Sequence, residues 1–327
     1  MADQHSHDHA HAQPHRIDVH HHFLPPDYVR IVGDDRIGPL ILAGKTPVWT
    51  PQHSIDAMDR NGIATALTSM SAPGLWFGDK QATIDLTRHC NEYASTMRTE
   101  HKGRFGMFAC LPLPDVEASL REIEYAFDTL KTEGIGLLTS YGDQHPGDPA
   151  FAPVFDELNR RKAVVYFHPT QAACSTCLGH IPAATLEFPF DTTRAVTSLL
   201  FGGTFARCPD IKWIFSHAGG AIPFLAERIS RLEVKPDFKK MVPNGVIAEL
   251  RKLYYDTALS ANDITFASLL KLVTPANVLF GSDYPFAPEG TMTATVTGLA
   301  KMPFSDAERA GIDRDNALKL LPGLVHI

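Results

Sequence analysis

Ile17-Asp18-Val19-His20-His21-His22 begins as an apolar run typical of a buried β-strand and ends in three histidines. Side chains alternate between the two faces of a strand, so His20 and His22 should point the same way, about 6 to 7 Å apart, with His21 opposite. Two imidazoles in that arrangement can share one cation. Metal-type side chains recur singly farther along the chain, at His168, His217 and Asp283.

Apolar and β-branched runs bounded by Gly, Pro and Asp occur eight times, and amphipathic helical stretches lie between them. The expected strands are 16–20, 63–70, 104–110, 135–140, 163–168, 211–216, 253–257 and 277–282. The expected helices are 53–61, 80–101, 115–133, 151–162, 192–207, 220–233, 243–251, 262–273, 291–300 and 305–320. Strands that are apolar almost throughout indicate parallel strands buried on both faces, in a (β/α)8 barrel or a doubly wound open sheet.

The metal-type residues favour the barrel. They lie at the carboxyl ends of the first, fifth, sixth and eighth expected strands, and only in a closed barrel do those ends converge on one mouth. We therefore expect an α/β fold of the (β/α)8 TIM-barrel type, forming a single domain over 16–327. Two long connections, 23–52 and 169–191, leave from the same mouth after strands one and five and are expected to form a lid or pocket wall.

Bulk properties exclude several classes of function. A formal charge of −7 and the lack of a basic run argue against nucleic-acid binding, so a small molecule is the expected partner. No apolar run is long enough to cross a membrane and no signal peptide is evident, which predicts a cytoplasmic protein.

Five cysteines do not form a disulfide framework, and Cys174-Ser-Thr-Cys177 is interpreted as a loop without a chemical role. Residues 1–15, with five histidines, are expected to be a disordered, cation-binding tail.

The histidines and the acid together suggest a catalytic metal centre. His20, His22, His168 and Asp283 offer the nitrogen and oxygen ligands that Zn²⁺ prefers, and such sites keep a position open for water or substrate. His217 would lie beside that position and could take or give a proton. The fourth strand, Gly134-Ile-Gly-Leu-Leu-Thr-Ser-Tyr141, has no Lys, Cys, His or acid that could bridge a second cation, so one metal per subunit is expected.

Four motifs resemble the amidohydrolase superfamily, and more narrowly its aminocarboxymuconate-semialdehyde decarboxylase-like branch. They are Asp18-Val-His-His-His22, Phe167-His168-Pro169, Ser216-His217-Ala-Gly-Gly220 and Gly281-Ser-Asp283-Tyr-Pro-Phe286. The resemblance implies one Zn²⁺, or Mn²⁺ as in some relatives, on the four ligands named above. It also implies an acid–base role for His217, a proton delivered by Asp283 or by water at His217, and a homodimer in which Arg228 grips a substrate carboxylate across the interface.

The resemblance also narrows the substrate. A second carboxylate-binding Arg of the semialdehyde decarboxylases is absent from Trp49-Thr-Pro-Gln-His-Ser-Ile-Asp56, which argues against a dicarboxylate. Asn61-Gly-Ile-Ala-Thr-Ala66, Ser71-Ala-Pro-Gly74 and Phe151–Arg160 look more like 6-methylsalicylate decarboxylases. Five aromatic side chains on the expected mouth loops could either pack a lid or stack on a substrate ring: Trp76, Phe77, Phe188, Phe190 and Phe286. Trp76, Phe190 and Phe286 are the candidates for substrate binding.

The leading hypothesis is a metal-dependent, non-oxidative decarboxylase, a carbon–carbon lyase acting on a salicylate-like aromatic monocarboxylic acid. The same ligand set could instead activate water for hydrolysis of an amide, ester or lactone, with His217 as base and then acid. A third interpretation is an inactive barrel that stores metal. The ligands alone do not separate decarboxylation from hydrolysis.

Overall fold

A computed structural model describes residues 15–173, 175 and 178–326 of the chain. Eight parallel strands pair in sequence order from β1 to β8. The barrel closes where β1 is hydrogen-bonded to the segment directly after β8: Val19 N donates to Phe280 O (3.0 Å), and His22 N donates to Tyr284 O (2.7 Å). The predicted barrel is therefore correct. The strands are β1 Arg16–His22, β2 Ile63–Ser69, β3 Phe105–Ala109, β4 Gly134–Leu138, β5 Val164–His168, β6 Lys212–Phe215, β7 Tyr254–Asp256 and β8 Val278–Leu279.

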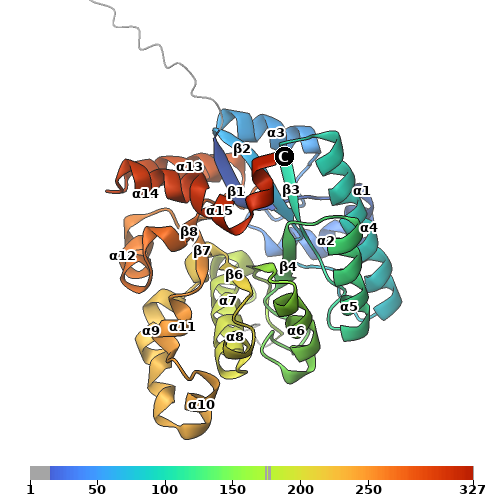
Figure 1. Cartoon of the computed structure of the whole chain (residues 1–327). Helices are drawn as coiled ribbons and strands as arrows, with labels where there is room; N and C mark the ends of the chain where they lie inside the picture. The colour runs from blue at the N-terminus through green and yellow to red at the C-terminus, as the bar shows by residue number, and fades with distance from the viewer. Residues whose placement is uncertain (1–14, 174, 176–177, 327) are drawn as a thin grey trace, which may run out of the picture.

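Helices surround these strands, and the chain runs round the barrel from blue to red in Figure 1. The α-helices are α1 Pro26–Val32, α2 Asp34–Ile37, α3 Pro51–Arg60, α4 Lys80–Glu100, α5 Val116–Glu124, α6 Ala152–Arg160, α7 Ala183–Phe201, α8 Thr204–Arg207, α9 Ile222–Ser230, α10 Pro236–Met241, α11 Val246–Leu250, α12 Asp263–Leu272, α13 Glu289–Lys301, α14 Asp306–Ala310 and α15 Asn316–Leu320. Shorter turns are η1 Gly38–Leu40, η2 Tyr125–Thr129, η3 Pro149–Phe151, η4 His217–Gly219, η5 Arg231–Val234, η6 Pro275–Asn277, η7 Gly311–Asp315 and η8 Pro322–His326. None of the helices among the described residues is long and apolar enough to cross a bilayer.

The largest departure from the predicted elements is α7. It begins at Ala183 rather than at 192, although Pro189 lies inside it and a proline removes a helical hydrogen bond. The extra turns are held because Ala183 and Phe188 pack with Ala72 in a small cluster beside the barrel mouth. The last nine residues of the long connection predicted after strand five, 183–191, thus form a helical wall. In the connection after strand one, the chain forms α1, α2 and η1.

A register shift in β1 sets which of its side chains face inward. Ile17 and Val19 belong to the apolar cluster inside the barrel, which also holds Val164 and Ile214 from the opposite strands. Simple alternation would then direct His21 inward as well. The pairing with β2 is instead irregular between Asp18 and His21, so that one extra residue is accommodated there. His20 and His22 consequently face the interior.

Two segments for which the sequence made predictions are described only in part or not at all. Residues 1–14 of the expected tail and both cysteines of the 174–177 motif lie outside the described residues. His15 is described: its backbone N–H donates to Gly62 O (3.1 Å) and its ring lies 3.3 Å from Asp313.

Candidate metal centre

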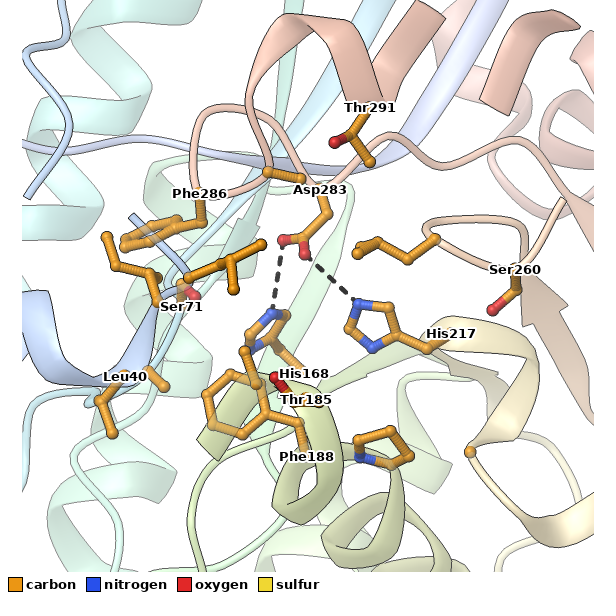
Figure 2. Close-up of a pocket in the computed structure, with 18 of the residues that line it drawn as sticks. Leu40, Ser71, His168, Thr185, Phe188, His217, Ser260, Asp283, Phe286 and Thr291 are labelled. Carbon is orange, nitrogen blue, oxygen red and sulfur yellow. Dashed lines mark hydrogen bonds and ion pairs between the residues drawn. The ribbon is translucent and has the colours of Figure 1, made fainter. Parts of the chain in front are cut away.

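The four predicted ligands converge at the mouth of the barrel. His20 and His22 come from the end of β1, His168 ends β5, and Asp283 follows β8. One ligand atom from each of the four lies within 4.8 Å of every other. Asp283 Oδ1 is 2.9 Å from His22 Nε2, 3.1 Å from His20 Nε2 and 3.8 Å from His168 Nε2. Figure 2 shows the Asp283 carboxylate reaching toward His168 on one side and His217 on the other.

The donor atoms fit a small divalent cation. His20 Nδ1 lies 2.7 Å from Asp256 Oδ2, and His22 Nδ1 lies 3.0 Å from the carbonyl oxygen of Ser69, so each ring donates a proton through Nδ1. The two Nε2 atoms then point toward each other, only 3.1 Å apart, and both lie beside Asp283 Oδ1. Zinc–ligand bonds of about 2.0 to 2.1 Å bring ligand atoms to roughly 3 to 3.5 Å of one another. A cation at this point would have three imidazole nitrogens and one carboxylate oxygen within reach as ligands.

The pKa values of these groups follow from their burial and mutual charge. Burial alone would lower the pKa of His20, but the carboxylates of Asp256 and Asp283 raise it to about 10. Burial lowers the pKa of His22, and it holds the pKa of His168 well below the usual value. Burial opposes ionisation of Asp283, but His20 and its neighbours keep the pKa of that carboxyl well below its usual range. The cluster therefore offers one carboxylate, two neutral imidazoles and a third imidazole whose proton a cation can replace.

His217 lies next to this cluster, outside the four ligands. Its Nε2 is 3.4 Å from Asp283 Oδ2, the carboxylate oxygen that does not face His20 and His22. His217 and Ala218 both adopt left-handed backbone conformations, with φ of 52° and 55°, and Asp283 does so with φ of 65°. Such conformations are costly for residues other than glycine and persist where surrounding contacts enforce them. The chain thus holds both side chains in place through strained backbone.

A cavity of about 490 Å³ opens above the cluster, with His168, His217 and Asp283 at its base. Its walls are mainly apolar, and Figure 2 shows Phe286 beside Asp283 and Phe188 lower in the view, near His168. Five hydroxyl side chains supply most of the other polar lining: Ser71, Thr185, Ser260, Thr265 and Thr291. Among the described residues that line it, there is no Lys or Arg. The cavity has the size and polarity for an aromatic ring with few polar substituents.

Of the four side chains predicted to contact the substrate, only one lines the cavity above the metal cluster. Phe286 lines the cavity, with its ring centroid 5.4 Å from that of His22. Trp76 lines a neighbouring cavity of about 390 Å³, which shares Leu40 with the first. Phe190 is 41% exposed and lies outside the lining, because two residues along a helix turn its side chain about 200° away from Phe188. Arg228 is exposed on α9 and does not reach the cavity of its own chain.

Several supporting residues escaped the sequence interpretation. Asp256, at the end of β7, accepts hydrogen bonds from His20 Nδ1 (2.7 Å), His217 N (2.8 Å) and Ala258 N (3.1 Å). Asp18 joins β1 to the loop after β8 by accepting from His20 N and from Ser282. A side chain at Gly281 would meet His20 Cβ at 2.8 Å, so only glycine fits there. Asp256 could have been found, since it is an acid at the carboxyl end of a predicted strand.

Comparisons with known proteins agree with this architecture. The family model described as amidohydrolase matches residues 17–323. The chain belongs to the amidohydrolase family. A decarboxylase of Aspergillus niger is 38% identical over 326 residues, covering 94% of this chain and 87% of the relative. The 6-methylsalicylic acid decarboxylase of Penicillium expansum is 35% identical over 315 residues, covering 94% of this chain and 97% of the relative. Among solved structures, an amidohydrolase II superimposes with a TM-score of 0.87 at 28% identity, covering 94% of this chain and 99% of that one.

Proposed function

We propose that this amidohydrolase is a metal-dependent, non-oxidative decarboxylase of a salicylate-like aromatic monocarboxylic acid. The observation that carries the proposal is a ligand cluster of three imidazoles and one carboxylate at the base of an apolar cavity whose described lining offers no Lys or Arg. A substrate carboxylate therefore has the cation as its counter-charge within the subunit. The similarity to fungal decarboxylases, including one acting on 6-methylsalicylic acid, supports this choice over hydrolysis.

The residues of the chain have separate tasks in such a reaction. A divalent cation held by His20, His22, His168 and Asp283 would supply Lewis-acid stabilisation of negative charge on substrate oxygens. Phe188 and Phe286 line the cavity and would contact the ring, and the apolar walls would exclude water.

Loss of carbon dioxide leaves an electron pair on the ring carbon, and that carbon must then receive a proton. His217 Nε2 and Asp283 Oδ2, 3.4 Å apart, are the two groups at the base of the cavity that can hold and pass this proton. Their separation suits a proton held by either group or passed directly between them.

The experiment that tests the proposal compares the two reactions open to this ligand set. Purified protein loaded with Zn²⁺ or Mn²⁺ is incubated with 6-methylsalicylate and salicylate, and carbon dioxide and the phenol product are quantified. A parallel panel of aryl amides, esters and lactones is assayed for hydrolysis. Carbon dioxide release from the salicylates with no hydrolysis is expected, whereas hydrolysis without decarboxylation would overturn the proposal in favour of an amide, ester or lactone hydrolase. Metal content measured in parallel identifies which ion sustains turnover, and we expect one Zn²⁺ per subunit.

We further propose that the protein acts as a homodimer and that Arg228 enters the cavity of the neighbouring subunit. Phe224, four residues earlier on α9, is 82% exposed, and Ile264, on the adjoining helix α12, is 83% exposed. Exposed apolar side chains on neighbouring helices are typical of an interface. Arg228 forms no ion pair with any residue that the structure describes. Its charge is thus available to a carboxylate in a partner's site.

Subunit mixing tests this arrangement. Arg228→Ala and His217→Asn subunits are each expected to be nearly inactive. In a hybrid dimer, the site with intact His217 receives the intact Arg228 of the other subunit, so random exchange should restore about a quarter of wild-type activity. No recovery despite proven exchange, or a monomer by light scattering, would contradict the shared site.

We place the protein in the cytoplasm as part of the same proposal. The odd cysteine count supports this location, as do Cys90, Cys110 and Cys208, which are buried free thiols rather than disulfides. Fractionation of the source cells tests it.

A further inference from the structure

Asp256 occupies a position between the metal centre and the acid–base histidine. It ends β7, and its side chain is fully buried. Its Oδ2 accepts from the Nδ1 of His20 at 2.7 Å. Its Oδ1 accepts from the backbone N–H of His217 at 2.8 Å and from that of Ala258 at 3.1 Å. One carboxylate therefore receives three donors from three separate segments of the chain.

The two oxygens serve different parts of the site. Through Oδ2, the carboxylate fixes the His20 ring in the tautomer that leaves Nε2 free to bind a cation, and it increases the basicity of that nitrogen. Through Oδ1, it anchors the backbone of His217 where the chain enters its left-handed turn at φ of 52°. The side chain of Ser216, which directly precedes η4, makes no capping hydrogen bond to the turn, so this bond from another strand helps to hold it.

We propose that Asp256 is a positioning residue that couples the two halves of the site, orienting His20 as a metal ligand and His217 as the acid–base group. The inference rests on the metal centre of the proposed function but not on the identity of the substrate. Asp256 itself does not line the cavity, so it acts through the two histidines.

The carboxylate cannot be replaced by an amide without loss. If the Asn oxygen faced His20, its NH₂ group would face the two N–H donors of His217 and Ala258, and both would lose their acceptor. If the Asn were turned over, its NH₂ would face His20 Nδ1 and force the ring proton onto Nε2, the nitrogen that must bind the cation. Either orientation damages one half of the site, which makes Asp256→Asn an informative variant.

The test measures metal affinity by chelator competition, the visible spectrum of the Co²⁺-substituted protein, and kcat and KM at saturating metal. Asp256→Asn is expected to bind metal 10- to 100-fold more weakly, as for other partners of ligating histidines, and to shift the Co²⁺ spectrum. After metal is restored, kcat should remain at least tenfold below wild type with KM nearly unchanged, because the His217 backbone stays displaced. If the wild-type protein proved not to decarboxylate salicylates, the metal-affinity and spectral measurements would still test this inference.

The matched control is Glu122→Gln. Glu122 is also a buried carboxylate, bonded to Arg88 and Asn91 on the outer helices, and neither it nor these partners line the cavity. It should lower thermal stability while leaving metal affinity within twofold of wild type. If Asp256→Asn behaved like this control, the carboxylate would be merely structural. Full recovery of kcat with excess metal would eliminate the coupling to His217.

A second variant, Asp256→Glu, provides the test if Asp256→Asn does not fold. Asp256→Glu keeps the charge but moves the carboxylate by one methylene, and it should bind metal about three- to tenfold more weakly with a partial loss of kcat. Wild-type affinity and turnover in Asp256→Glu would refute the geometric requirement.

Discussion

Replacing His217 by Asn separates acid–base chemistry from metal binding. His217 contributes no atom to the four-residue ligand cluster, and its Nε2 approaches only the outer oxygen of Asp283, at 3.4 Å. Asparagine is also among the residues that tolerate the left-handed conformation best, so the φ of 52° at this position adds little strain to the variant. The substitution therefore removes a titratable group while retaining the local backbone.

The expected loss is large and confined to turnover. A positioned general acid or base contributes about 10²- to 10⁴-fold to the rate, which is about 2.7 to 5.4 kcal/mol of activation free energy at 1.36 kcal/mol per decade. We expect kcat for decarboxylation of 6-methylsalicylate to fall by that factor in His217→Asn. Bound metal should stay near one equivalent per subunit, and the free energy of unfolding should change by less than about 1 kcal/mol.

The assay is stopped-time product analysis under saturating substrate, with metal content determined on the same samples. His217→Gln, with a longer side chain, is the companion variant and should be equally slow. A fall in kcat of less than tenfold at full metal occupancy would refute the acid–base role. Loss of the metal itself would show that His217 is a fifth ligand, which also contradicts the assignment.

Three further predictions concern stability and metal binding. In Gly281→Ala, the new Cβ would lie 2.8 Å from His20 Cβ, whereas ordinary carbon contacts are about 3.5 to 4.0 Å, so the His20 ring must move by roughly 1 Å. We expect the free energy of unfolding, measured in urea, to fall by about 1 to 3 kcal/mol and metal binding to weaken. Removing the metal with a chelator should lower the free energy of unfolding by about 2.7 kcal/mol relative to protein at a free metal concentration of 100 Kd, and an unchanged melting temperature would argue against a resident ion. Glu157, bonded to Arg160 and Arg161, has its pKa lowered to about 2 chiefly by the hydrogen bond from Arg160. The contribution of Glu157 to the free energy of unfolding should be present above about pH 4.5 and disappear toward pH 2. Glu157→Gln should therefore lower the free energy of unfolding by about 0.5 to 1 kcal/mol at pH 7, a modest value because the pair is partly solvated. The loss measured by urea unfolding should become progressively smaller at pH 4 and pH 3. An equal cost at all three pH values would contradict the pairing.

The barrel and its ligand cluster could be predicted because both depend on strand ends. Periodicity located every strand with bounds that differ from the structure by at most three residues, and in a parallel barrel every carboxyl end reaches the same mouth. His20, His22, His168 and Asp283 needed only that rule to be placed together, and the structure brings them within 4.8 Å. The same rule applied to Asp256 would have added it to the site.

What the sequence could not reveal depends on irregular backbone. His20 and His22 were expected to share a face, and they do, but the register shift that directs them inward beside Ile17 and Val19 has no sequence signal. The early start of α7 was missed because a proline inside a helix is unfavourable locally, and the packing of Ala183 and Phe188 with Ala72 that offsets this cost is not visible in the sequence. The role of Arg228 across subunits was suggested only by the family resemblance, because no pattern within one chain indicates a contact with a second copy.

Two buried carboxylates explain how an irregular strand can still place ligands accurately. On the outer face of β1, Asp18 accepts hydrogen bonds from the backbone of His20 and from the ring of His21, as well as from the backbone and hydroxyl of Ser282. On the inner face, Asp256 accepts from the ring of His20. An apolar side chain can slide within a core at small cost, whereas a buried carboxylate with several donors has one geometry that satisfies them all. Because His20 is bonded to one such group through its backbone and to the other through its ring, its position is fixed from both faces of the strand before any cation binds.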